Sequence, residues 1–151
     1  REGFLYLAFI LDVYSRRVGW AMATHLRTEL VVDALEMALW RRKPAAGLIH
    51  HTDRGAQYTA LSFGKKLEEA GVVPSMGRVG SALDNAVSES FVASSKCELL
   101  HRHRFLGREA ARIAIFDYIE GFYNRVRRHS SLGYLSPADY EQATMKEVAV
   151  A

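Results

Sequence analysis

Cysteine, proline and long apolar segments are scarce in this chain of 151 residues. Its one cysteine, Cys97, excludes an intrachain disulfide, as suits a reducing cytoplasm. No apolar run approaches the ~18 residues that a membrane-spanning helix needs, so we expect no membrane partner. The chain also lacks repeats, low-complexity tracts and linkers rich in proline or glycine. We therefore expect one domain over residues 1–151.

The overall charge gives little information about partners, whereas its distribution gives more. The composition is 49% hydrophobic and 25% charged, as in ordinary globular proteins, and the net charge is only +3. Residues 121–137 contain no acidic residue but include Arg125, Arg127 and Arg128. Such a basic stripe can follow a phosphate backbone. Two alternatives stay open, namely a solvated helix face and pairing with acids of the same domain.

Hydrophobic periodicity predicts an alternation of strands and helices. Strands are expected at residues 4–13, 18–24 and 48–52, with a short edge strand at 72–75. Helices are expected at 29–42, 59–70 and 84–101, then from residue 107, with a last short helix from residue 137. The first strand is apolar throughout, which is typical of a strand buried on both faces. This order predicts an α/β fold with a mixed sheet flanked by helices.

Two carboxylates stand out from this pattern. Asp53 directly follows a predicted buried strand, and Glu89 lies near the start of a predicted helix. Lys96 follows Glu89 by seven residues, two helical turns later on the same face. Two acids beside a basic side chain suit Mg²⁺ or Mn²⁺ in phosphate chemistry. Taken singly, Asp53 also fits a turn and Glu89 a solvated helix face.

Other polar residues near these acids have simpler interpretations. Asp84 is better explained as the cap of the helix that carries Glu89. His50 and His51 precede Asp53 without any cysteine nearby, so we expect packed or hydrogen-bonded histidines rather than a zinc site.

Four segments carry a resemblance to a known family. They are residues 4–17 (FLYLAFILDVYSRR), 48–58 (LIHHTDRGAQY), 84–96 (DNAVSESFVASSK) and 123–137 (YNRVRRHSSLGYLSP). In this order and spacing they resemble the catalytic core of bacterial insertion-sequence transposases. That group is the closest to retroviral integrases within the DDE superfamily. The resemblance implies a ribonuclease-H-like fold.

The resemblance also assigns roles and partners. It makes Asp53 the second and Glu89 the third metal-binding acid of a catalytic triad, with Mg²⁺ or Mn²⁺ as cofactor. It makes Lys96 the basic residue that contacts DNA near the cut. Further DNA contacts are expected from Asn85, Arg125, Arg127, Arg128 and His129. The implied partners are double-stranded DNA, as element ends and target, and further copies of the chain, in the bacterial cytoplasm near the nucleoid.

One departure from the family pattern changes the expected activity. The family's first catalytic Asp lies on a central strand just before the segment that begins here at Glu2, and it has no counterpart. We therefore expect an N-terminally truncated core that is weak or inactive in cleavage and strand transfer. The alternatives are a non-catalytic DNA-binding or oligomerisation fragment and a nuclease of similar fold.

Overall fold

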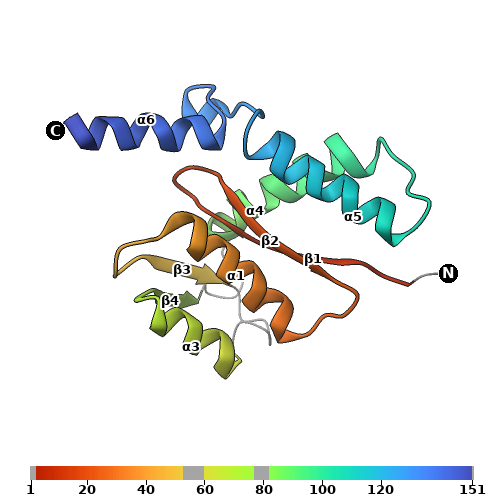
Figure 1. Cartoon of the computed structure of the whole chain (residues 1–151), viewed down its shortest axis with the longest axis horizontal. Coiled ribbons are helices and arrows are strands. Elements are labelled where there is room, and N and C mark those ends of the chain that lie inside the picture. Colours follow the sequence, from red (N-terminus) through yellow and green to blue (C-terminus); the bar gives the residue numbers. More distant parts are fainter. Residues whose placement is uncertain (1–2, 53–59, 77–81, 151) are drawn as a thin grey trace. The chain divides into compact units, whose positions relative to one another are not determined.

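The computed structural model describes residues 3–52, 60–76 and 82–150, with side chains from residue 86 onward in the last range. Its elements begin with β1 (Tyr6–Leu11), β2 (Val18–Ala23), α1 (Thr28–Arg42), β3 (Ile49–Thr52), α3 (Leu61–Glu69) and β4 (Val73–Met76) (Figure 1). They continue with α4 (Ala82–Ser95), the π-helix η1 (Lys96–Leu100), α5 (Arg108–Phe116), the π-helix η2 (Asp117–Tyr123), the 3₁₀ turn η3 (Ser130–Leu132) and α6 (Pro137–Val150). The predicted strands, and the helices that became α1 and α3, agree with these bounds to within two residues.

The chain forms two compact units. The first unit comprises Arg1–Ile10 and Gly19–Val92, and the second comprises Leu11–Val18 and Ala93–Ala151. The first unit therefore holds most of the strands and Glu89, whereas the second holds Lys96 and the arginines of the last motif.

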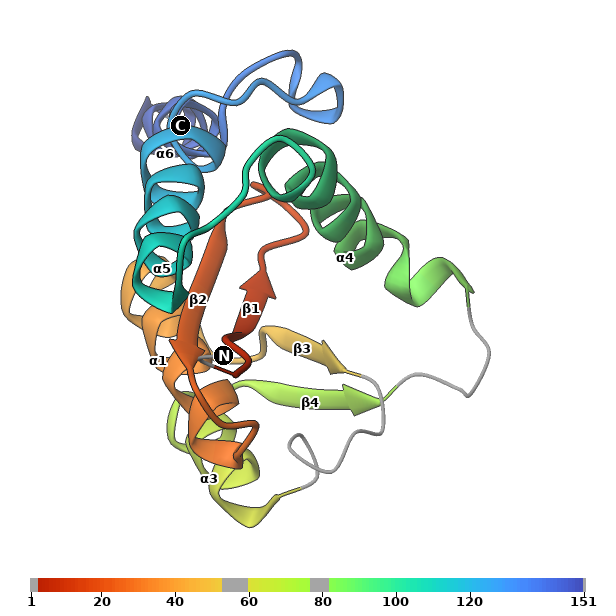
Figure 2. The ribbon, with the colours of Figure 1, turned by 90° about the vertical axis from the view of Figure 1, so that its right-hand side faces the viewer.

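The strands form two pairs of different direction. β1 and β2 run in opposite directions, whereas β3 and β4 are parallel, with Ile49 opposite Val73 (Figure 2). The predicted mixture of strand directions is therefore present. Among the described residues each sheet has two strands, so β1 and β3 each have a described partner on one edge only. Every residue of β1 is half-buried, whereas its apolar sequence predicts a strand buried on both faces.

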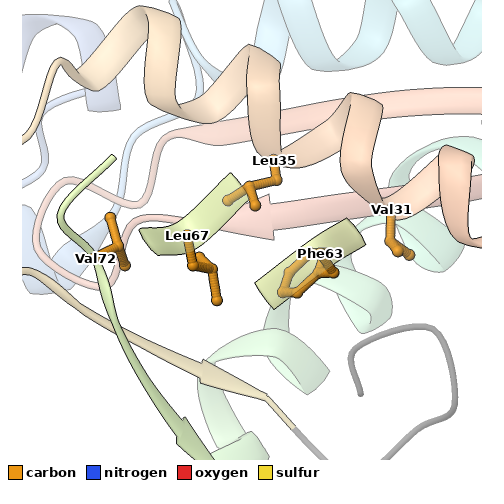
Figure 3. Close-up of a cluster of buried hydrophobic side chains, with 5 residues drawn as sticks. All are labelled: Val31, Leu35, Phe63, Leu67 and Val72. Carbon is orange, nitrogen blue, oxygen red and sulfur yellow. The ribbon is translucent and has the colours of Figure 1, made fainter. Parts of the chain in front are cut away.

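The core of the first unit lies between two helices and the strands. Val31 and Leu35 of α1 point toward Phe63 and Leu67 of α3, and Val72 closes the cluster beside β4 (Figure 3). All five side chains are buried, with exposed fractions of 1% for Phe63 and 2% for both leucines. Ala8 and Ile10 of β1 pack against the same cluster, so it joins the two strand pairs. Burial of these apolar surfaces is the main stabilising contribution to this unit.

A glycine allows α1 to approach β2 closely. A Cβ atom placed on Gly19 would lie 2.7 Å from the Cβ of Ala38, closer than real Cβ contacts. Both residues therefore have to be small for the helix to cover this strand.

In the second unit, polar contacts tie the β1–β2 turn to the C-terminal elements. Glu141 of α6 accepts a hydrogen bond from Ser15 Oγ at 2.8 Å. It also forms an ion pair with Arg17, whose Nη1 donates a hydrogen bond to it at 2.6 Å. Asn124, which is 1% exposed, accepts from the Val18 amide at 2.9 Å and donates to the Val18 carbonyl at 3.0 Å. The buried amide thus gives Val18 the two bonds that a neighbouring strand would supply.

Three helix predictions need correction. α4 begins at Ala82, so Asp84 lies inside its first turn instead of capping it. The predicted helices 84–101 and from 107 both change to π-helical winding, in η1 and η2. The last helix is 14 residues long, not short.

The core predicts a contrast within α3. Phe63→Ala should lower the free energy of unfolding by about 3–5 kcal/mol, because it leaves a cavity between α1 and α3. Leu61→Ala on the same helix should change it by less than about 0.5 kcal/mol, because Leu61 is 90% exposed. Urea unfolding of both variants measures the difference, and equal losses would contradict this description of the core.

Candidate active site

The two predicted metal-binding acids belong to different segments of the first unit. Asp53 lies outside the described residues, directly after Thr52, the last residue of β3. Glu89 lies in α4, and its side chain is exposed. The described residues contain no group of three His, Cys, Asp or Glu side chains placed to bind a metal. The convergence of Asp53 and Glu89 therefore stays a prediction.

Lys96 is the first residue of η1, and its side chain is exposed. Its backbone carbonyl accepts a hydrogen bond from the His101 amide at 2.9 Å, five residues ahead, which defines the wider π turn. Asn85 lies in the first turn of α4, in the part for which only the backbone is described.

Arg127 is engaged within the second unit. Its Nε donates to both oxygens of Glu98, at 2.9 and 3.0 Å, and its Nη2 lies 2.9 Å from Glu98 Oε1. Nη2 also donates to Ser94 Oγ at 3.2 Å, and the guanidinium lies 5.7 Å from the centre of the Tyr123 ring. Tyr118 donates a further hydrogen bond to Glu98 at 2.7 Å. These contacts favour the alternative in which this arginine pairs with an acid of its own domain.

The electrostatics of this cluster are consistent with a charged pair. Burial alone would raise the pKa of the Glu98 carboxyl, but hydrogen bonds from Arg127 and Tyr118 hold it below its usual value. The hydrogen bond to Glu98 raises the pKa of Arg127 in turn. The pair is therefore ionised at neutral pH. Removal of one partner would leave the other charge partly desolvated and unpaired.

His129, a predicted DNA contact, lies beside this cluster. Its ring meets that of Tyr123 edge to face, with centroids 5.1 Å apart. Burial, with a smaller effect from the charge of Arg127, lowers the pKa of His129 to about 4. At neutral pH this histidine is therefore uncharged, and it offers no positive charge to a phosphate.

Arg125 and Arg128 differ from Arg127. Both side chains are exposed, and no described acidic residue forms an ion pair with either. The basic motif therefore has one arginine engaged internally and two that face solvent. Sequence reasoning missed this division, because Glu98 lies 29 residues from Arg127 along the chain.

His50 packs in the first unit, as expected for a histidine near a strand end. Its ring centre lies 5.5 Å from that of Phe63 in the core. Burial, with a smaller effect from His51, lowers the pKa of His50 to about 4. His51 is exposed and contacts Ser75 of β4 at 3.3 Å.

Two family models, both described as integrase core domain, match residues 1–82 and 70–137.

This chain belongs to the integrase core domain family.

Curated relatives of this integrase core include transposases. The chain is 46% identical over 145 residues to "Transposase InsF for insertion sequence IS3A" of Escherichia coli (strain K12), covering 95% of this chain and 50% of that protein. It is 48% identical over 143 residues to "Insertion element IS600 uncharacterized 31 kDa protein" of Shigella sonnei, covering 94% of this chain and 53% of that protein. The predicted resemblance to insertion-sequence transposases is confirmed. The integrase core spans about half the length of the curated relatives it matches.

Solved structures with the same fold confirm the predicted ribonuclease-H-like class. A crystal structure of the catalytic core domain of BIV integrase matches with a TM-score of 0.63 at 15% identity, covering 94% of this chain and 89% of that one. The simian T-cell lymphotropic virus intasome in complex with PP2A regulatory subunit B56 gamma matches with a TM-score of 0.71 at 12% identity, covering 91% and 48%. At these identities the likeness concerns the fold alone. None of the described helices is long and apolar enough to cross a membrane.

The packing of His50 predicts acid sensitivity of the integrase core. Its folded pKa of about 4 lies below the value of 6.5 in the unfolded chain, so the unfolded state takes up the proton first as the pH falls. The contribution of His50 is complete above pH 6.5 and is lost between pH 6.5 and 4, by at most about 3 kcal/mol. His50→Gln should make the free energy of unfolding fall less over this range.

Urea unfolding at several pH values tests this prediction. His101→Gln, which removes an exposed histidine, serves as the matched control and should keep the wild-type loss. If the free energy of unfolding falls equally in wild type and His50→Gln between pH 6.5 and 4, another group is responsible for the acid sensitivity.

Proposed function

We propose that this chain is the catalytic core of an insertion-sequence transposase, which cleaves a DNA strand at the element end and joins the freed 3′-hydroxyl to target DNA. The observation that carries the proposal is the 46% identity to the InsF transposase over 95% of the chain. The two acids fit the same chemistry by residue type and position. The proposed partners are double-stranded DNA and further copies of the chain, and the proposed location is the nucleoid region of the bacterial cytoplasm.

Asp53 and Glu89 are the residues that would hold a divalent cation. Carboxylate oxygens are the ligands that Mg²⁺ and Mn²⁺ prefer, and the exposed carboxylate of Glu89 is accessible to a hydrated ion. A bound ion would lower the pKa of a water or hydroxyl nucleophile and offset phosphate charge. The protein's own part would be to bring together Asp53, which directly follows β3 in the sequence, and Glu89, which lies on α4.

Exposed cations of the second unit are the proposed DNA contacts. Lys96, Arg125 and Arg128 all face solvent, and none forms an ion pair with a described acid. Such side chains can neutralise phosphates without reading sequence. Asn85 and His129 remain proposed contacts that would act as neutral hydrogen-bonding groups.

The metal site is tested by removing each acid in turn. We expect the 151-residue chain to bind Mn²⁺ weakly, and Asp53→Asn and Glu89→Gln should each reduce this binding at least several-fold, because each replaces an anionic ligand by a neutral one of the same size. Electron paramagnetic resonance of free Mn²⁺ reports the binding. Asp33→Asn, an exposed acid on α1, is the control and should bind as wild type.

The same variants test the chemistry. We expect Mn²⁺-dependent joining of an element-end duplex to a target duplex to be weak and to disappear in both variants. Joining that survives both substitutions would overturn the assignment of these acids. Hydrolysis without joined products would instead favour a nuclease.

The DNA surface predicts a change in salt dependence. Arg125→Ala with Arg128→Ala should reduce the slope of log affinity against log salt by about two units on any duplex, because two phosphate contacts are lost. Lys65→Ala with Lys146→Ala removes the same charge from exposed positions on α3 and α6 and should leave the slope unchanged. If both double variants lower the slope equally, the effect is one of net charge and not of contact.

A further inference from the structure

We infer that Arg127 is a positioning residue, which fixes the π turn at η1 through Glu98 and Ser94 so that Lys96 faces the DNA. This role rests on the proposed contact of Lys96 with phosphate. It differs from direct DNA contact by Arg127 itself. All of the residues that carry the inference lie in the second unit.

Arg127 forms a clamp, by which we mean its contacts with Ser94 and Glu98, and Lys96 lies between these two residues in the sequence. Ser94 and Glu98 are four residues apart, so they lie on one face of the helical segment, and the Arg127 guanidinium bridges them at 3.2 and 2.9 Å. Lys96 lies midway between them, on the opposite side of the segment, where its side chain is exposed. A clamp on the inner face therefore determines the direction in which Lys96 points.

The segment that carries Lys96 is wound as a π-helix, η1. π-helical turns are rare, and they occur mostly as single turns within α-helices, frequently at functional sites. Here the π turn begins at Lys96, whose carbonyl accepts the hydrogen bond from the His101 amide. Lys96 lies in the middle of the five-residue segment, 94–98, whose ends Arg127 bridges. At the other end of η1, Arg102 Nε donates to the Cys97 carbonyl at 3.2 Å, and His103 Nδ1 lies 3.0 Å from the Leu99 carbonyl. Both ends of the turn are thus held by side chains.

The Arg127 guanidinium contacts Glu98 and Ser94 at the same time. Arg127 uses its Nε and Nη2 on Glu98, and Nη2 also donates to Ser94. Its Cζ atom lies over the Tyr123 ring. A lysine ammonium carries the same charge but cannot form this fork. The substitution Arg127→Lys therefore separates geometry from charge.

The test is a double-mutant cycle on duplex DNA binding at several salt concentrations. Lys96→Ala should reduce the slope of log affinity against log salt by about one unit. Arg127→Lys should give the same reduction although the net charge is unchanged, and it should give no further reduction in the Lys96→Ala background. Glu98→Gln should reproduce the effect of Arg127→Lys, because it weakens the clamp from the other side.

Each other outcome has a defined meaning. The positioning role would be overturned if Lys96→Ala lowers the slope of log affinity against log salt and Arg127→Lys leaves it at the wild-type value. A slope unaffected by Lys96→Ala would remove the proposed phosphate contact of Lys96, and the positioning role with it, while Arg125 and Arg128 are tested separately. Additive losses would show that Arg127 contacts DNA directly.

The folded state of each variant is checked on the same preparations. Far-UV circular dichroism at the binding temperature shows that each variant is folded. Tyr118→Phe removes the Tyr118 hydroxyl, with its hydrogen bonds to Glu98 and Ser95, and leaves Arg127 unchanged. It should lower the melting temperature while keeping the slope, which is the pattern that a purely structural role would give for Arg127→Lys as well.

Discussion

The Glu98 carboxylate is the group on which the organisation of the second unit depends. It lies at the centre of a half-buried cluster and accepts hydrogen bonds from Arg127 and Tyr118. These bonds outweigh the cost of removing the carboxylate from water, as its lowered pKa shows. Because Arg127 also binds Ser94, the interaction joins α4, η1 and the segment after η2. A partly buried ion pair of this kind constrains geometry more clearly than it adds stability.

The basic motif after η2 therefore has two sides. Its internal side holds Arg127 against Glu98 and Asn124 against the backbone of Val18. Its external side presents Arg125 and Arg128 to solvent. A short stretch of sequence can thus stabilise the unit and offer cations to a phosphate backbone at once. The charge of each arginine is the same, and only its partner decides its role.

Local patterns in the sequence predicted the elements well because strand and helix signals are local. Hydrophobic periodicity gave the bounds of β2 and α1 closely. The π turns were not predictable, because no local sequence pattern distinguishes them from the α-helices that they continue. For the site, the motifs identified the family and predicted Asp53 and Glu89 as its metal-binding acids, whereas no spacing rule could show that Arg127 pairs with Glu98.

The central claim is that Asp53 and Glu89 share one cation site, and paramagnetic broadening by Mn²⁺ tests it most directly. In amide spectra of the 151-residue chain, substoichiometric Mn²⁺ should broaden the signals of residues adjacent to Asp53 and those adjacent to Glu89 together, because the two acids would bind the same ion. Excess Mg²⁺ should restore both sets, since it competes for the same oxygen ligands. Broadening of one set alone, or of neither, would contradict a shared site.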